Sequence, residues 1–514
     1  MGTQLLALYH ERVKKEWKIA FLSTFIIGLL VHIYKFTNTL LNHDSVYNYY
    51  SDQNIISLGR WFLSVACGFS SYFDLPWVNG LFSIVLIALT AVIIVDIFEM
   101  KNPVLITITG ALLAAFPGTT ETFFFEFTAD GYMLAMLLAA AAVWLTRIDR
   151  PGVGRTIAAI VCICLSCGIY QAYVSFALVL AFCYVLYRLL EGRFGTGQYL
   201  AYAGRQIVIY AAGLVLYYVI WKIMLVLQNA SIKDYQGISD IGFSLWTIIK
   251  AIPGTLRTWC FFFLEWNVLE HGWTLYGVLN VIFIILFIVC LIAAVIKRKL
   301  IQRKAQLLLA LIALAAIPFS SCIWLFTSED VSYRPMMLES LCILYILLGV
   351  IAEEFLQIRW KNLAALLLTV IVFNYGIMAN IAYYYMNQEY EASYAMASEI
   401  LYRIHMMDTD ADKIAVLSSD DYTTALDVSD EHANKIHIFS ALLGDNILYD
   451  TEHTVLFLNG TFDCDYVKAA ADEIDELEAS DEVAEMGVWP ASDSVQVIGD
   501  TIVIKLSEVE TEEE

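Results

Sequence analysis

Charged residues are scarce in this chain of 514 residues: 16% of the residues are charged, while 59% are hydrophobic. A water-soluble protein of this length does not need so large an apolar fraction to build its core. The sequence therefore predicts an integral membrane protein. The first apolar run is too long for a signal peptide and lacks a small-residue cleavage site, so we expect no cleavable leader.

Basic residues are nearly missing from the C-terminal region. Residues 388–514 hold 31 acidic and 5 basic side chains, whereas residues 1–387 hold 21 acidic and 25 basic ones. Such a contrast indicates two regions with different solvents. We expect residues 1–387 to form a transmembrane catalytic domain and residues 388–514 to form an acidic, soluble domain.

Cysteine pairs are also missing from the acidic region, where Cys464 stands alone and no internal disulfide is expected. Cys162, Cys164 and Cys167 have a spacing that resembles a metal site, but they lie in an apolar run without histidine or acidic partners. We interpret them as buried small apolar side chains. No metal motif is recognised, which leaves the cofactor unknown and a divalent cation open. We expect no nucleic-acid partner.

Long apolar runs are abundant. About 20 apolar residues cross the hydrocarbon core of a membrane, and eleven runs approach that length. They lie near residues 18–41, 76–98, 103–117, 128–146, 156–169, 172–190, 206–228, 273–296, 305–327, 335–356 and 363–386.

The charges of the connections between these runs indicate an orientation. Cytoplasmic connections carry an excess of lysine and arginine, and every second connection in this chain is basic. With a cytoplasmic N-terminus, eleven spans place the C-terminal domain outside the cytoplasmic membrane. The bases of the predicted inner connections are Lys101, Arg147, Arg150, Arg155, Arg188, Arg193, Arg205, Lys297, Arg298, Lys299, Arg303, Lys304, Arg359 and Lys361.

The first predicted outer loop, residues 41–61, combines acidic, basic and aromatic side chains next to the membrane surface. It contains His43, Asp44, Asp52 and Arg60. A carboxylate held there suits a general base that removes a proton from a hydroxyl group, while the reacting donor is anchored in lipid. We therefore predict Asp44 as the catalytic base, with His43 beside it.

Other predicted outer segments supply further candidates. Residues 117–130 contain Glu126 and Asp130, and residues 229–272 are expected to include an interfacial helix rich in Trp and Phe. If the donor is a polyprenyl-phosphate sugar, a cation must stabilise the leaving phosphate. The candidates are Arg60, Arg257 and Arg334 for the phosphate, and Tyr47, Tyr50, Trp61, Gln171 and Tyr173 for the sugar.

Four stretches together resemble a known family. His43-Asp44 follows the first span, residues 57–61 read Ser-Leu-Gly-Arg-Trp, and residues 125–132 and 170–173 open or interrupt later spans. This arrangement is similar to that of the bacterial type II glucosyl transferases, polytopic enzymes of the GT-C class, over most of residues 18–386. The resemblance implies a mainly α membrane protein with a GT-C-like fold.

The resemblance also implies an activity. It implies inverting transfer of glucose from a polyprenyl-phosphate donor to a surface glycan, such as an O-antigen or a cell-wall polymer, on the outer face of the bacterial cytoplasmic membrane. The first-loop acid is the expected base in that family, and Asp44 is the position that matches. Many relatives have two adjacent acids there, whereas this chain has His43, so Glu126 or Asp130 is left open as a second carboxylate.

Each assignment has an alternative. Asp44 could cap the helical turn that follows it, Arg60 could extend to lipid headgroups, and Arg334 could pair with Glu329 or Asp330. A transporter or flippase of lipid-linked sugars is the main rival function, and a structural subunit of a cell-envelope assembly is the second. Among enzymes, a GT-C protein that uses another sugar stays open.

The acidic region is predicted to be a small α/β domain. We expect a helix over residues 390–407, buried strands over residues 413–418 and 454–458, and an acidic helix over residues 465–479. Residues 494–506 are expected to form a hairpin that turns at Gly499 and Asp500.

Overall fold

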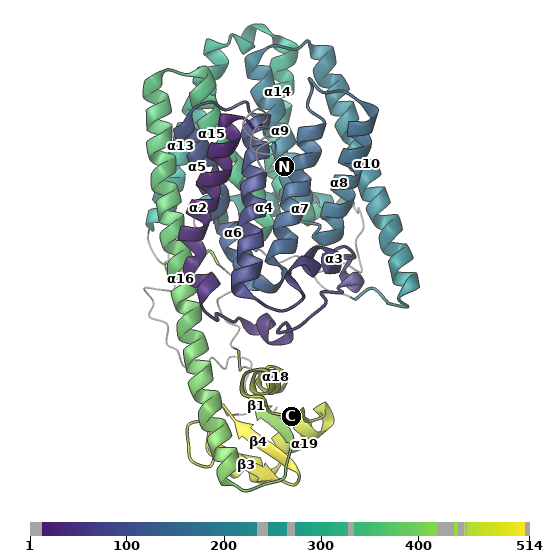
Figure 1. Cartoon of the computed structure of the whole chain (residues 1–514), viewed down its shortest axis with the longest axis vertical. Coiled ribbons are helices and arrows are strands. Elements are labelled where there is room, and N and C mark those ends of the chain that lie inside the picture. Colours follow the sequence, from purple (N-terminus) through teal and green to yellow (C-terminus); the bar gives the residue numbers. More distant parts are fainter. Residues whose placement is uncertain are drawn as a thin grey trace, which may run out of the picture. The chain divides into compact units, whose positions relative to one another are not determined.

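The computed structural model of the chain describes residues 13–233, 245–264, 273–326, 334–418, 436–439, 447–448 and 450–508. Within these ranges the protein is mainly helical and has a small C-terminal sheet (Figure 1). The described residues divide into two compact units. The first contains residues 52–380 together with the N-terminal helix, and the second contains residues 37–51 and most of the chain after residue 380.

Each predicted apolar run contains a helix of the structure. Nine helical stretches of the described residues are long and apolar enough to cross a membrane. The stretch Pro103–Leu145 holds two of the predicted runs, and the apolar helix Val153–Ile169 is shorter than these nine stretches, which explains the difference from eleven. The helices are α2 (Lys15–Thr37), α4 (Pro76–Ile97), α5 (Pro103–Ala115), α7 (Glu126–Leu145), α8 (Val153–Ile169), α9 (Tyr173–Glu191), α10 (Thr196–Leu227), α13 (Leu275–Lys297), α14 (Lys304–Ser321), α15 (Cys342–Phe355) and α16 (Ile358–Met406).

Local sequence explains several helix boundaries. Helices α4 and α5 begin with proline. Proline has no backbone N–H, but in the first turn of a helix that N–H would have no partner within the helix, so no hydrogen bond is lost. The Asn102 side chain accepts hydrogen bonds from Val104 N and Leu105 N and so caps α5. Helices α8 and α9 end and begin on either side of residues 170–172, as predicted from the polar interruption there.

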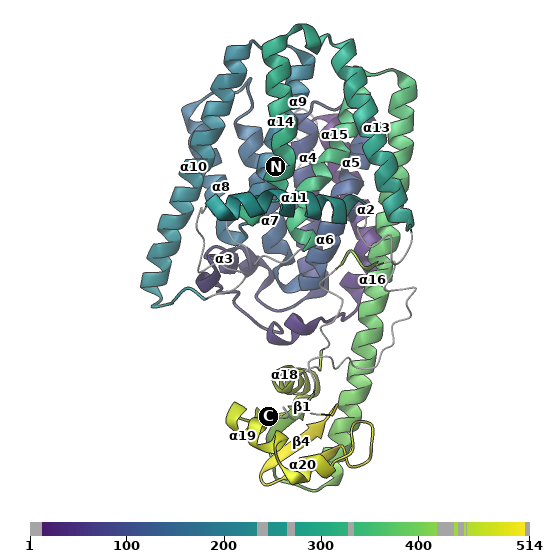
Figure 2. The ribbon, with the colours of Figure 1, turned by 180° about the vertical axis from the view of Figure 1, so that it is seen from behind.

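The predicted interfacial segment contains helix α11 (Leu245–Leu264). Figure 2 shows α11 lying across the upright helices of the first unit, whereas α13 and α14 run along them. This crosswise course is the one expected of a helix in the plane of a membrane interface. His271, which the same segment contains, lies outside the described residues.

The second unit contains a four-stranded sheet with the order β2-β1-β4-β3. Strand β1 (Lys413–Leu417) pairs in parallel with β2 (Val467–Lys468) and with β4 (Thr501–Lys505), while β3 (Val495–Ile498) pairs antiparallel with β4. The predicted hairpin is confirmed, and Gly499 at its turn has a φ of 65°, which glycine adopts without strain. The predicted strand over residues 413–418 is also confirmed.

One predicted strand is wrong. Residues 454–458 lie inside helix α18 (Thr451–Phe462). Asp450 caps this helix, since its Oδ1 accepts a hydrogen bond from His453 N at 2.7 Å. Thr451, Val455 and Leu458 are buried at the spacing of one helical face. A short apolar run of this kind has the same appearance in a buried strand and in a helix. The acidic helix is shorter than predicted: α19 covers Ala471–Glu478, and β2 precedes it.

Residues 37–51 pack into the core of the second unit. Leu41 and Val46 are buried in one cluster with Ile400, Val416 and Leu458. Tyr49 lies against Gly460, where a Cβ atom would collide with its ring. The segment that carries His43 and Asp44 is therefore built on side chains of the C-terminal region.

Replacing Leu41 by Ala tests this packing. A buried leucine that is truncated to alanine costs roughly 2–5 kcal/mol, so Leu41→Ala should lower the free energy of unfolding of the detergent-purified protein by about that amount. Val467→Ala, at a β2 side chain that is 54% exposed, is the matched control and should change it by less than about 0.5 kcal/mol. Equal stability of the two variants would contradict the packing.

Candidate active site

Asp44 lies in a short 3-10 helix, η1 (His43–Tyr47), and its side chain is 49% exposed. Its Oδ1 lies 3.6 Å from His43 Nε2. The side chain that caps η1 is Asn42, whose Oδ1 accepts a hydrogen bond from Ser45 N at 2.9 Å. The capping role considered for Asp44 therefore belongs to Asn42, and the Asp44 carboxylate is accessible for chemistry.

Glu126 begins α7 and is buried, with 1% of its side chain exposed. Its Oε2 lies 3.2 Å from Nζ of Lys35, a lysine of α2 that is 3% exposed. A buried carboxylate needs such a partner because its desolvation is costly. Lys35 is not among the predicted site residues, although a lysine inside the first apolar run is itself a signal for a buried partner.

Asp74 adds a second carboxylate to the surroundings of Lys35. It precedes α4, and burial raises the pKa of its carboxyl group, while the Lys35 ammonium opposes that rise. Asn79 of α4 donates a hydrogen bond to the carbonyl oxygen of Glu126 at 3.2 Å. Together these contacts fix the start of α7 against α2 and α4.

Asp130 is also buried, one turn further along α7. Its Oδ1 accepts a hydrogen bond from Gly131 N at 2.8 Å. The three predicted acids thus differ in kind, since Asp44 is accessible whereas Glu126 and Asp130 are enclosed in the first unit.

The three predicted arginines also differ. The Arg60 guanidinium donates a hydrogen bond to Tyr132 Oη at 3.0 Å and lies 4.8 Å from the ring centroid of Tyr170. The rings of Tyr132 and Tyr170 stack at 4.6 Å. Arg257 is exposed on α11, and Arg334 is half-buried where it precedes the helical turn η7 (Pro335–Leu341). Glu329 and Asp330, the alternative partners of Arg334, lie outside the described residues.

The backbone before Arg60 is held by α10 and by the break between α8 and α9. Gln171 Nε2 donates hydrogen bonds to Leu58 O at 2.8 Å and to Tyr217 Oη at 2.9 Å. Trp221 Nε1 donates one to Ile56 O at 2.7 Å. Gly59, with a φ of 79°, is enclosed so closely by these side chains that a Cβ atom would collide with Tyr217 and Gln171. These contacts give Arg60 a defined position.

The predicted sugar-contacting aromatic residues fall into two groups. Tyr47 and Tyr50 are exposed, at 42% and 60%. Trp61 and Tyr173 are buried, and the indole of Trp61 packs against Gly168. Among these predicted aromatic residues, only Tyr47 and Tyr50 are exposed.

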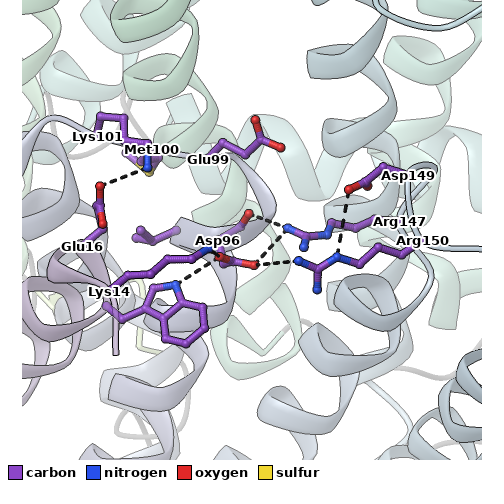
Figure 3. Close-up of a pocket in the computed structure, with 11 residues that line it drawn as sticks. Lys14, Glu16, Asp96, Glu99, Met100, Lys101, Arg147, Asp149 and Arg150 are labelled. Carbon is purple, nitrogen blue, oxygen red and sulfur yellow. Dashed lines mark hydrogen bonds and ion pairs between the residues drawn. The ribbon is translucent and has the colours of Figure 1, made fainter. Parts of the chain in front are cut away.

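A charged pocket lies at the other ends of α4 and α7 (Figure 3). Asp96 binds Lys14 Nζ at 2.6 Å and Arg147 at 3.1 Å, and it accepts a hydrogen bond from the indole of Trp144. Acidic and basic side chains balance in this pocket and pair with one another, so we interpret it as a network that joins helix ends. None of the predicted site residues lines it.

In the part of the chain that the structure describes, no group of three or more His, Cys, Asp or Glu side chains has the geometry of a metal site.

Comparison with known proteins identifies one family. A family model described as Glucosyl transferase GtrII matches residues 33–353. The match confirms the resemblance inferred from the motifs at residues 43–44, 57–61, 125–132 and 170–173. No curated protein and no solved structure shows a significant match.

The Lys35–Glu126 pair can be tested through stability. Lys35→Met leaves the Glu126 carboxylate buried without its cation, which should lower the free energy of unfolding by about 3–5 kcal/mol. The double variant Lys35→Met, Glu126→Gln removes both charges and should recover most of that loss. Lys222→Met, at an exposed lysine of α10, is the control. Wild-type stability of Lys35→Met in denaturant unfolding would show that the pair is not formed.

Proposed function

The chain belongs to the glucosyl transferase GtrII family, and from this premise we propose that it transfers glucose from a polyprenyl-phosphate donor to a surface glycan. The match makes the protein a glucosyltransferase, and its apolar helices make it a multi-pass membrane protein. The lipid donor, the glycan acceptor, the outer face of the membrane and the inversion at the anomeric carbon are the proposed parts.

The observation that supports this reaction best is the accessible Asp44 beside His43 in the first loop. A hydroxyl oxygen of the acceptor attacks the anomeric carbon, the bond from that carbon to the phosphate oxygen breaks, and Asp44 takes the hydroxyl proton. The lipid phosphate leaves with the electron pair. Such general base catalysis contributes roughly 10²–10⁴-fold to the rate. Because the attack comes from the face opposite the phosphate, the anomeric configuration inverts.

The leaving phosphate requires positive charge. Arg60 is our first candidate because its guanidinium is oriented by Tyr132 and Tyr170, and Arg334 and Arg257 are further candidates. A guanidinium presents several N–H donors in a plane, which suits phosphate oxygens. Glu126 is a weaker candidate for the second carboxylate, since Lys35 already pairs with it.

Asp44→Asn tests the base. The amide keeps the size of the side chain but cannot accept the proton, so the turnover number should fall by roughly 10²–10⁴-fold, with little change in stability. Asp52→Asn is the matched control, because Asp52 is an exposed acid of the same loop whose carboxylate accepts a hydrogen bond from Asn54 N. Full activity of Asp44→Asn in a purified transfer assay would refute this assignment, and Asp130 would be tested next.

The side of the membrane on which the C-terminal region lies can be tested by cysteine labelling. Cys464 is the only cysteine after residue 342 and is partly exposed in the second unit. With a cytoplasmic N-terminus and eleven spans, an impermeant thiol reagent should label Cys464 in intact cells, and Cys464→Ser should abolish that signal. Labelling that requires permeabilised cells would place the C-terminal region in the cytoplasm and contradict the proposed face.

A further inference from the structure

Helix α18 of the acidic region packs directly on the turn that carries Asp44. The ring of His453 lies 4.9 Å from that of Tyr47, nearly perpendicular to it at 88°, and 6.5 Å from the ring of His43. Residues 43 and 47 are the first and last of η1, so His453 contacts the turn on both sides of Asp44.

His453 is itself held in place. The Asp450 carboxylate lies 2.8 Å from His453 Nδ1, and the same oxygen accepts the hydrogen bond from His453 N that caps α18. The His453 side chain is buried. Burial disfavours the charged form of Asp450, but its hydrogen bonds from His453 outweigh this and lower the pKa of the carboxyl group. A carboxylate that binds one ring nitrogen fixes the orientation of an imidazole.

The end of α18 fixes the turn a second time. Tyr49 Oη lies 3.0 Å from Thr461 Oγ1, and Gly460 leaves room for the Tyr49 ring. One helix thus contacts the turn at His43, Tyr47 and Tyr49. Asp450 thus caps α18 and also orients the buried His453 ring against the turn that carries Asp44. A C-terminal domain without a part in the reaction would not require this arrangement.

We propose that His453, oriented by Asp450, is a positioning residue for the reaction, and that the acidic C-terminal region is part of the catalytic apparatus. His453 acts through His43 and Tyr47, whose placement sets the direction of the Asp44 carboxylate. This inference rests on the proposed function of Asp44 as the base. Among the described residues, Glu452 of α18 pairs with Lys468 at 2.7 Å and also bonds the Tyr47 side chain, and Asp463 follows the end of the helix.

The direct test measures turnover and donor KM for His453→Ala, His453→Gln and Asp450→Asn in the full-length protein. A misplacement of a catalytic group by about 1 Å can cost about 10²-fold in rate. We expect His453→Ala to lower kcat by about 10–10²-fold with little change in donor KM. His453→Gln, which retains a polar planar side chain, should recover part of the loss. Asp500→Asn, an exposed carboxylate of the same region that pairs with Lys413, should have wild-type kcat.

A double-mutant cycle separates positioning from general damage. If His453 acts through Asp44, His453→Ala should have little further effect on the residual turnover of Asp44→Asn, because the group that it positions is already inactive. Equal fold-losses in both backgrounds, or wild-type kcat of His453→Ala, would overturn the inference while leaving Asp44 as the base. Full activity of Asp44→Asn, or the absence of any transfer by the wild-type protein, would instead overturn the proposed function and this inference with it.

Discussion

The burial of Leu41 and Val46 among side chains of the C-terminal region determines where the Asp44 turn can be. Each buried side chain of this size contributes roughly 1.5–3 kcal/mol relative to exposure. The Asn42 side chain accepts a hydrogen bond from Ser45 N at the start of the turn. After the turn, the Tyr49 hydroxyl bonds Thr461 of α18. Asp44 itself makes none of these structural contacts. The turn is therefore held by its neighbours while the Asp44 carboxylate stays accessible, which is what a general base requires.

Paired charges organise the ends of the first unit in a similar way. Asp96 joins Lys14, Arg147 and Trp144 at one end of α4 and α7, and Lys35 joins Glu126 at the other end. Within a membrane protein such groups need partners, since an isolated buried charge is strongly destabilising. These pairings account for the buried charges of Lys35, Asp96, Glu126 and Arg147 without a ligand. Arg60, which is oriented by two tyrosines, is the better candidate for the donor phosphate.

Features of the fold that depend on neighbouring residues could be predicted from the sequence. Apolar runs of membrane length, the break at residues 170–172 and the hairpin at Gly499 all follow from neighbouring residues and were confirmed. The strand predicted over residues 454–458 was wrong, because a short apolar run has the same appearance in a buried strand and in a helix. The Lys35–Glu126 pair and the contact of His453 with the His43 turn join residues far apart in the chain. No local pattern encodes such pairs, so the packing of α18 on the His43 turn could not be predicted from the sequence.

The proposed reaction is tested most directly by measuring sugar transfer by the purified wild-type protein in vesicles that contain polyprenyl-phosphate glucose and a glycan acceptor. Parallel reactions would use polyprenyl-phosphate mannose and arabinose as donors. The proposed reaction predicts release of polyprenyl phosphate, glucose attached to the acceptor, and an inverted anomeric configuration by NMR. Glucose that stays on its lipid while the lipid crosses the bilayer would contradict it and indicate a flippase. Retention of configuration would contradict the single displacement with Asp44 as base.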